Sequence, residues 1–165
     1  MLSCHELFGF MPPALAIEIM EFAYSTDKPV YRETLKAVAE ARKVRPAFLE
    51  RQPRVERHKQ MVSVLSRPRS ELIAANLLGN WLIGAQGTML TEFLNHLGID
   101  HENGVVKDFP STMDDTKLNE GVELLLSKYA PEKVAVYLSA FYSINEPQWP
   151  NLGAILEKDT RLHLG

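Results

Sequence analysis

Apolar residues recur at helical spacing over most of the chain. In residues 14–24, "ALAIEIMEFAY", only Glu18 and Glu21 interrupt an apolar run, and they lie three positions apart on one narrow strip. Residues 29–44, "PVYRETLKAVAEARKV", instead mix apolar and charged residues at the spacing of an amphipathic helix. These patterns predict a largely buried helix followed by a half-exposed one.

The next segment, residues 44–60, reads "VRPAFLERQPRVERHKQ". Pro53 predicts a helix break, because proline donates no backbone hydrogen bond and clashes with the preceding turn. Phe48, Val55 and Val62 recur every seven residues. We expect them to form an apolar seam that packs against another helix.

Residues 72–91 contain no formal charge, so they are long enough and neutral enough to be tested as a membrane span. Asparagine, glutamine, threonine and three glycines within this segment disfavour hydrocarbon, and Glu92 follows it at once. We therefore expect a buried central helix with a break near residues 84–87, and no membrane association.

One face of this central segment is polar but uncharged. If the helix is continuous, Asn76, Asn80, Gly84, Gly87 and Thr91 fall on one side of it. A solvated helix face usually carries charged residues, so this face is expected to be covered by a helix, a partner or a ligand. The candidate ligand groove consists of Asn76, Asn80, Trp81 and Gly84.

Helical signals continue to the end of the chain. Gly98 is a helix stop, Asn103-Gly104 indicates a tight turn, and further helices are expected after Pro131 and Pro150. The pattern predicts an all-α fold of about seven or eight helices, arranged as a compact helical bundle or a short array of antiparallel helical hairpins. Its 165 residues fit a single domain, with 1–69 and 70–165 as sub-units.

Charge is distributed unevenly. Residues 42–69 hold nine basic and two acidic residues, whereas residues 70–165 hold six basic and thirteen acidic ones. Such asymmetry indicates a charged partner or pairing within the chain. The candidate partner-binding residues are Arg45, Arg51, Arg54, Arg57 and Lys59. They are expected to meet an acidic protein or the chain's own acidic C-terminal half, and nucleic acid is a less favoured third partner because the overall isoelectric point is about 6.0.

Motifs for common chemistry are missing from the sequence. It contains no His-Glu-x-x-His, no phosphate-binding glycine loop and no Gly-x-Ser-x-Gly. His96 and His101 are weak metal candidates, outweighed by a helix-terminal position for the first and a polar loop for the second. The sequence therefore predicts no resident cofactor and favours a protein that is not an enzyme.

A single cysteine, Cys4, excludes an internal disulfide and indicates a reducing compartment. We also read no signal peptide in the first residues, so a cytoplasmic location is expected. The leading hypothesis is a non-enzymatic helical interaction or adaptor module. A nucleic-acid-binding regulator that uses the 42–69 segment, and a helical protein that binds a small ligand or a metal, remain the alternatives.

Overall fold

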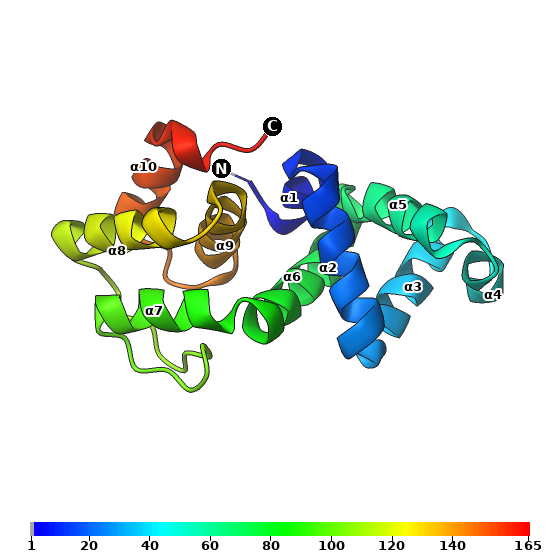
Figure 1. The fold of residues 1–165 in the computed structure, drawn as a ribbon, viewed down its shortest axis with the longest axis horizontal. Coiled ribbons are helices and arrows are strands. Elements are labelled where there is room, and N and C mark those ends of the chain that lie inside the picture. The colour runs from blue at the N-terminus through cyan, green and yellow to red at the C-terminus, as the bar shows by residue number, and fades with distance from the viewer. Residues whose placement is uncertain (1) are drawn as a thin grey trace. The chain divides into compact units, whose positions relative to one another are not determined.

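The computed structural model describes residues 2–165, and in this range the chain is all-helical, as predicted (Figure 1). Ten α-helices and two short 3₁₀ helices are found among these residues, more than the seven or eight expected. The chain divides into two compact units, residues 2–81 and residues 82–164, hereafter the N-terminal and C-terminal units. Their boundary falls inside α6 (Glu71–Ala85), later in the chain than the 69/70 boundary expected from charge.

The N-terminal unit is a small helical bundle in which α5 contacts α1, α2, α3 and α4. A 3₁₀ helix, η1 (Pro68–Ser70), leads from α5 into α6. The α-helices of the N-terminal unit that precede α6 are α1 (Cys4–Phe10), α2 (Pro13–Thr26), α3 (Lys28–Arg42), α4 (Pro46–Glu50) and α5 (Arg54–Leu65). The predicted break at Pro53 is confirmed, since α4 ends before it and α5 begins directly after it.

Helix α1 was not expected, and its start is stabilised by a distant carboxylate. The backbone N–H groups of Cys4 and His5 donate to Glu71 at 3.2 and 2.9 Å, and the His5 ring lies 2.6 Å from the same side chain. Burial raises the pKa of Glu71, but these hydrogen bonds outweigh it and lower the pKa below its usual value. Donors that a helix start leaves unpaired are thus satisfied by a residue more than sixty positions away.

The C-terminal unit packs four helices around a core of aromatic and aliphatic side chains (Figure 1). They are α7 (Gly87–Leu97), α8 (Asp115–Lys128), α9 (Pro131–Ile144) and α10 (Pro150–Lys158), followed by the 3₁₀ helix η2 (Thr160–Leu162). Helix α8 lies along α7, and the two approach closely at Gly121. A Cβ at Gly121 would lie 3.1 Å from Cε1 of Phe93, so glycine permits this helix contact.

The long connection between α7 and α8 is anchored by Trp149, the residue that precedes α10. Trp149 is buried and donates from its indole nitrogen to the carbonyl of Pro110 at 2.8 Å. The expected turn at Asn103-Gly104 is confirmed: both residues have positive φ, 53° and 88°, and Glu102 pairs with Val105 in an isolated antiparallel bridge. This combination of angles is typical of a two-residue hairpin turn.

Helix α5 packs against other helices, as expected, but the apolar seam predicted from Phe48, Val55 and Val62 is wrong. Phe48 is 50% exposed and Val55 is 54% exposed, while Val62 lies half-buried along an open apolar groove between α5, α1 and α2. The side of α5 that faces the core carries Arg57, His58, Met61, Val64 and Leu65 instead. The seven-residue repeat of apolar residues indicated the wrong side of α5, because two polar residues, Arg57 and His58, occupy inward positions.

The charge-free segment is interrupted where the sequence predicted a break, near residues 84–87. Gln86 adopts non-helical angles and separates α6 from α7, so Asn76 and Thr91 do not lie on one continuous helix face. Leu72 is 88% exposed, which shows that the segment is not buried on every side. Among the residues described, no helix is both long enough and apolar enough to cross a bilayer.

Substitution of Gly121 tests the close approach of α7 and α8. Alanine normally stabilises a helix relative to glycine by about 1 kcal/mol. Gly121→Ala is expected to lose this gain and to be about 1–3 kcal/mol less stable than Gly79→Ala, because its Cβ crowds Phe93. No atom lies within 4 Å of a Cβ at Gly79, which serves as the control. Unfolding free energies from urea titration measure both, and equal gains would contradict the close approach.

Candidate functional site

Two adjacent polar side chains of α5 are buried in the N-terminal unit. Arg57 is 8% exposed and His58 is completely buried. Both lie between the core-facing apolar residues of α5, so the fold must supply hydrogen-bond partners for them. This polar cluster is the most unusual feature of the N-terminal unit.

The hydroxyl of Tyr31, on α3, connects the two buried side chains. Arg57 donates from Nε to the Tyr31 oxygen at 2.8 Å, and the same hydroxyl lies 2.9 Å from Nε2 of His58. Because the guanidinium can only donate, the phenol oxygen accepts from Arg57, and its O–H donates a hydrogen bond to Nε2 of a neutral His58. Arg57 also donates from Nη1 to the backbone carbonyl of Glu50 at 3.0 Å, which ties the end of α4 to α5.

This arrangement assigns the protonation state of His58. With Nε2 accepting from Tyr31, the proton of a neutral ring sits on Nδ1, which lies 3.3 Å from Oε1 of Glu21 without good hydrogen-bond geometry. Burial lowers the pKa of His58, and Arg57 and Arg54 add to this effect, although Glu21 opposes it. Burial likewise raises the pKa of Tyr31, against the influence of Arg57, so its hydroxyl keeps its proton.

Tyr24 and Arg54 form the outer layer of the cluster. The Tyr24 ring meets the ring of Tyr31 edge to face at 5.2 Å between centroids, and the Arg54 guanidinium lies 4.8 Å above the Tyr24 ring. Arg54 also pairs with Glu21, with 3.2 Å between Nε and Oε1. A cation stacked on an aromatic face at the surface contributes about 0.5–1 kcal/mol.

The structure separates the five predicted partner-binding residues into different environments. Arg45, Arg51, Arg54 and Lys59 are exposed, whereas Arg57 is buried and cannot reach a macromolecular partner. The ion-pair partner of Arg54 is Glu21 of the N-terminal unit rather than a residue of the acidic C-terminal half. Lys59 lies 3.8 Å from Glu56 on its own helix and borders the apolar groove that Val62 also lines.

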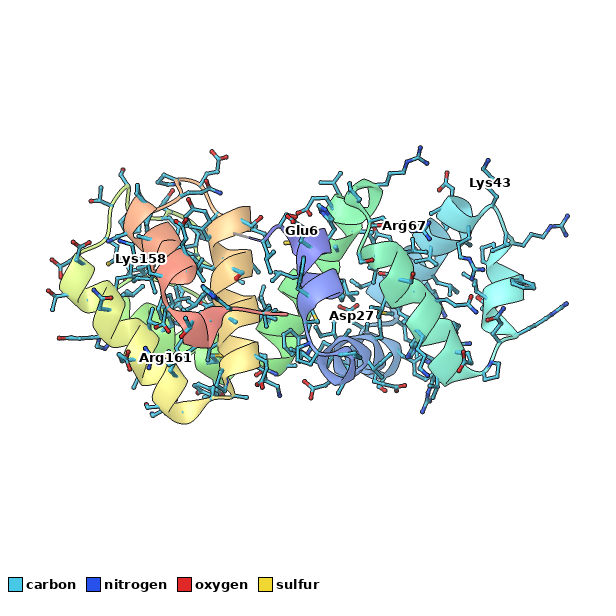
Figure 2. All side chains as sticks on the ribbon, turned by 90° about the horizontal axis from the view of Figure 1, so that it is seen from above. Glu6, Asp27, Lys43, Arg67, Lys158 and Arg161 are labelled. Carbon is cyan, nitrogen blue, oxygen red and sulfur yellow. The ribbon has the colours of Figure 1, made fainter. Side chains whose placement is uncertain are left out.

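A basic corner is formed by residues 42–51, which include α4. Arg45 and Arg51 flank the half-exposed Phe48, and neither arginine has an ion-pair partner among the residues that the structure describes. Figure 2 shows Lys43 at this corner with its side chain directed away from the helices. Leu49, which is fully buried, is the residue that attaches the corner to the rest of the unit.

The predicted ligand groove on α6 is only partly open. Asn76 and Gly84 are exposed and Asn80 is half-buried, but Trp81 is 1% exposed. Asn80 donates from Nδ2 to the backbone oxygen and the side-chain oxygen of Asn76 at 2.8 and 3.1 Å. The two asparagines therefore satisfy each other in part, and binding of a ligand to them stays a prediction.

The two metal candidates hold other partners. His101 accepts from the backbone N–H of Gly104 at Nδ1 and hydrogen-bonds Asn95 through Nε2, which is the geometry of a turn-stabilising residue. His96 lies in the last turn of α7, 3.6 Å from Glu120 of α8. Across residues 2–165, no group of three or more histidine, cysteine, aspartate or glutamate side chains is placed to hold a metal ion.

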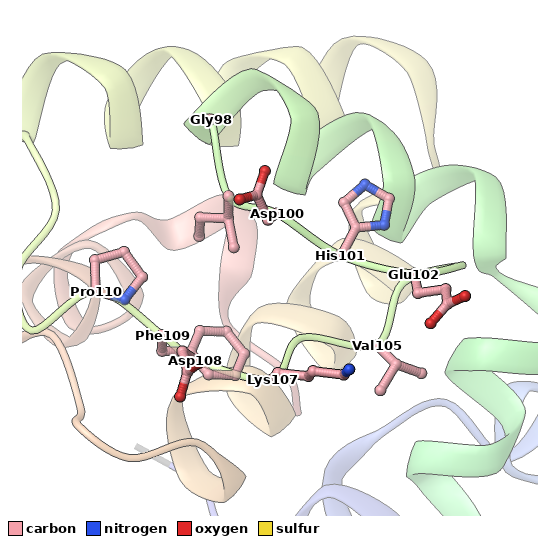
Figure 3. A pocket seen from close by; sticks show the side chains of 10 residues that line it. Gly98, Asp100, His101, Glu102, Val105, Lys107, Asp108, Phe109 and Pro110 are labelled. Atoms are coloured by element: carbon pink, nitrogen blue, oxygen red, sulfur yellow. The ribbon is translucent and has the colours of Figure 1, made fainter.

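Figure 3 shows the pocket formed by the α7–α8 connection around His101. It has a volume of about 610 Å³ and carries three carboxylates, those of Asp100, Glu102 and Asp108. In Figure 3 these carboxylates point in different directions rather than toward a common centre. The pocket therefore presents scattered charge and no converging set of ligands.

Sequence reasoning missed the part that Tyr24, Tyr31 and His58 play. Tyr31 and His58 lie on helices whose amphipathic pattern is visible in the sequence, but neither was predicted to be buried. A signal was present: in residues 54–65 the apolar residues Met61, Val64 and Leu65 share a side with Arg57 and His58. Projecting the whole helix, instead of following the seven-residue repeat, would have placed both polar residues inward.

Comparison of the chain with protein-family models, with curated proteins and with solved structures found no match.

Removing the Tyr31 hydroxyl tests the buried cluster. Tyr31→Phe leaves Nε of Arg57 and Nε2 of His58 without their partner, so the free energy of unfolding is expected to fall by about 1–3 kcal/mol. Tyr24→Phe is the matched control, because the contacts described for Tyr24 are made by its ring. Urea denaturation measures both variants, and a similar small change in the two would contradict the network.

Protonation of His58 predicts a pH-dependent stability. Because the pKa in the folded protein lies below the ordinary value of 6.5, the unfolded chain binds the proton more readily. The free energy of unfolding is expected to decrease as the pH falls below about 6.5, toward the depressed pKa of the folded state. His58→Gln should flatten this slope between pH 6.5 and pH 5, whereas the exposed His163→Gln should keep it. A slope that survives in His58→Gln would show that another group causes it.

Proposed function

We propose that this chain is a protein-interaction module that binds an acidic partner segment through the basic corner at residues 42–51. The observation that supports it is a half-exposed phenylalanine, Phe48, flanked by two exposed arginines that have no ion-pair partner among the residues the structure describes. An aromatic anchor with neighbouring arginines is the composition found at the energetic centres of protein interfaces.

Charge complementarity determines the chemistry of the partner. Four cationic side chains lie within residues 42–51, against the single carboxylate of Glu50. A partner segment with several Asp or Glu residues around one or two large apolar side chains would cover Phe48 and neutralise the cations. Complementary charge would raise the association rate, and the apolar contact would slow dissociation.

The placement of the other arginines makes nucleic acid the weaker alternative. A phosphate-binding surface requires several cations on one accessible face. Of the arginines in residues 42–69, Arg57 is buried and Arg54 is engaged by Glu21 and the Tyr24 ring. Arg45 and Arg51 are exposed, and neither has an ion-pair partner among the residues described, which suits a short acidic peptide better than a duplex.

Fluorescence anisotropy with a labelled acidic peptide that contains leucine and phenylalanine tests the proposal. We expect saturable binding, and no binding to a peptide in which lysine replaces each acidic residue. Phe48→Ala should weaken the affinity about tenfold or more, and Arg45→Glu with Arg51→Glu should abolish it. The matched controls are Phe10→Ala, which removes a phenylalanine of similar exposure, 48%, and Arg67→Glu with Arg69→Glu, which reverses exposed arginines outside the corner.

Four results would contradict the proposal. The first is equal affinity for the acidic peptide and for its lysine version. The second is a loss of affinity in the control variants as large as in the variants of the corner. The third is binding to duplex DNA or RNA with a steep salt dependence in place of the peptide, which would favour the nucleic-acid alternative. Self-association measured by analytical ultracentrifugation and removed by Phe48→Ala would identify the corner as a contact between copies of this chain, and would also overturn an acidic partner.

A further inference from the structure

A cavity of about 410 Å³ lies beside the buried cluster of the N-terminal unit. Residues of α2, α3, α4 and α5 line it, including Tyr24, Lys28, Tyr31, Arg32, Glu50 and Arg57. Its volume is within the range of sites that hold small molecules in proteins. It borders the basic corner at Glu50, but neither Phe48 nor Arg45 lines it.

The wall of this cavity contains a buried guanidinium with unused donors. Arg57 is fixed on one side by the Tyr31 hydroxyl and by the carbonyl of Glu50, through Nε and Nη1. Its third nitrogen, Nη2, makes no hydrogen bond to any residue in the described range. Nη2 is not sealed from solvent, so it is free to donate to an oxyanion that enters the cavity lined by Arg57.

The charges around the cavity favour an anion. Lys28 and Arg32 are exposed at its rim, on the first turns of α3, and have no ion-pair partner among the residues described. Together with Arg57 they supply three positive charges against the single carboxylate of Glu50. The rings of Tyr24 and Tyr31 supply the apolar part of the wall. A concave site with excess positive charge and aromatic walls concentrates small anions.

We propose that this cavity binds a small metabolite that carries an oxyanion, either a phosphate or a carboxylate. Nη2 of Arg57 donates to the oxyanion, Lys28 and Arg32 neutralise it from the rim, and the remainder of the molecule packs against Tyr24 and Tyr31. Arg57 is already oriented by two hydrogen bonds, so binding does not have to order it. The proposal does not depend on an acidic partner at the basic corner.

Isothermal titration calorimetry at constant ionic strength tests the site with inorganic phosphate, phenyl phosphate and benzoate. We expect one saturable site per chain, with phenyl phosphate tighter than inorganic phosphate because its ring covers the tyrosines. The order of phenyl phosphate and benzoate identifies the preferred oxyanion, and either order supports the site. Binding of none of the three at millimolar concentration would overturn the proposal.

Variants at the rim separate the site from general attraction to a basic protein. Arg32→Ala should weaken phenyl phosphate binding about tenfold, and Lys28→Ala should weaken it in the same direction. Lys36→Ala is the matched control, since Lys36 is an exposed cation of the same helix and does not line the cavity. Equal losses of affinity in all three variants, or no loss in Arg32→Ala and Lys28→Ala, would overturn the proposed site.

Arg57→Lys tests the guanidinium itself, with circular dichroism to establish that the variant folds. It keeps the charge but loses the planar fork that donates to Tyr31 and the cavity together. A folded variant that binds phenyl phosphate as tightly as the wild type would overturn the role of Nη2. If the variant does not fold, the rim variants decide the question.

Discussion

The hydroxyl of Tyr31 is the contact on which the N-terminal unit depends. It is the shared partner of Arg57 and His58, two polar side chains that would each cost several kcal/mol to bury alone. To reach it, α5 must lie against α3 with these two residues turned inward. The second contact of Arg57, to the carbonyl of Glu50, then positions α4. Through these contacts one phenol oxygen helps to fix the positions of α3, α4 and α5 relative to one another. Apolar packing alone is less directional and would fix them less strictly.

The same constraint decides which surfaces remain for partners and ligands. Because Arg57 and His58 occupy the inward side of α5, Val55 is turned outward and Val62 borders an open groove. Because Leu49 is the buried side chain of the short helix α4, Phe48 stands at the surface beside the exposed Arg45 and Arg51. Two nitrogens of Arg57 are taken by Tyr31 and Glu50, and the side chain also lines a cavity. The proposed corner and the proposed anion site are thus different consequences of one buried polar cluster.

The C-terminal unit is held together differently. Its core is aromatic: Phe93 meets Tyr137 and Phe141 edge to face at 5.6 and 5.9 Å, and Gly121 lets α8 approach closely enough to cover Phe93. Trp149 then secures the α7–α8 connection through the carbonyl of Pro110. Edge-to-face aromatic contacts are prominent here, whereas the N-terminal unit adds a buried polar network to its apolar core.

Local chemistry was readable from the sequence. Helical periodicity and proline positions predicted the all-α fold, the break at Pro53 and the helix beginning at Pro131, because these depend on each residue and its near neighbours. The Asn103-Gly104 turn followed for the same reason, since few residues adopt positive φ readily. Helix α1 was not predicted, although Ser3 and Glu6 form a local capping box at its start. The contacts of its first N–H groups with Glu71 come from far along the chain and could not be predicted.

Which side of a helix is buried, and what a cation pairs with, depended on residues distant in sequence. Phe48 and Val55 were expected inside and lie outside, since burial of Arg57 and His58 requires a partner that only α3 supplies. The sequence likewise predicted that Arg45, Arg51, Arg54, Arg57 and Lys59 act together as one partner-binding surface. The fold assigned them separate environments, because a buried hydroxyl, a nearby carboxylate and solvent each stabilise positive charge differently.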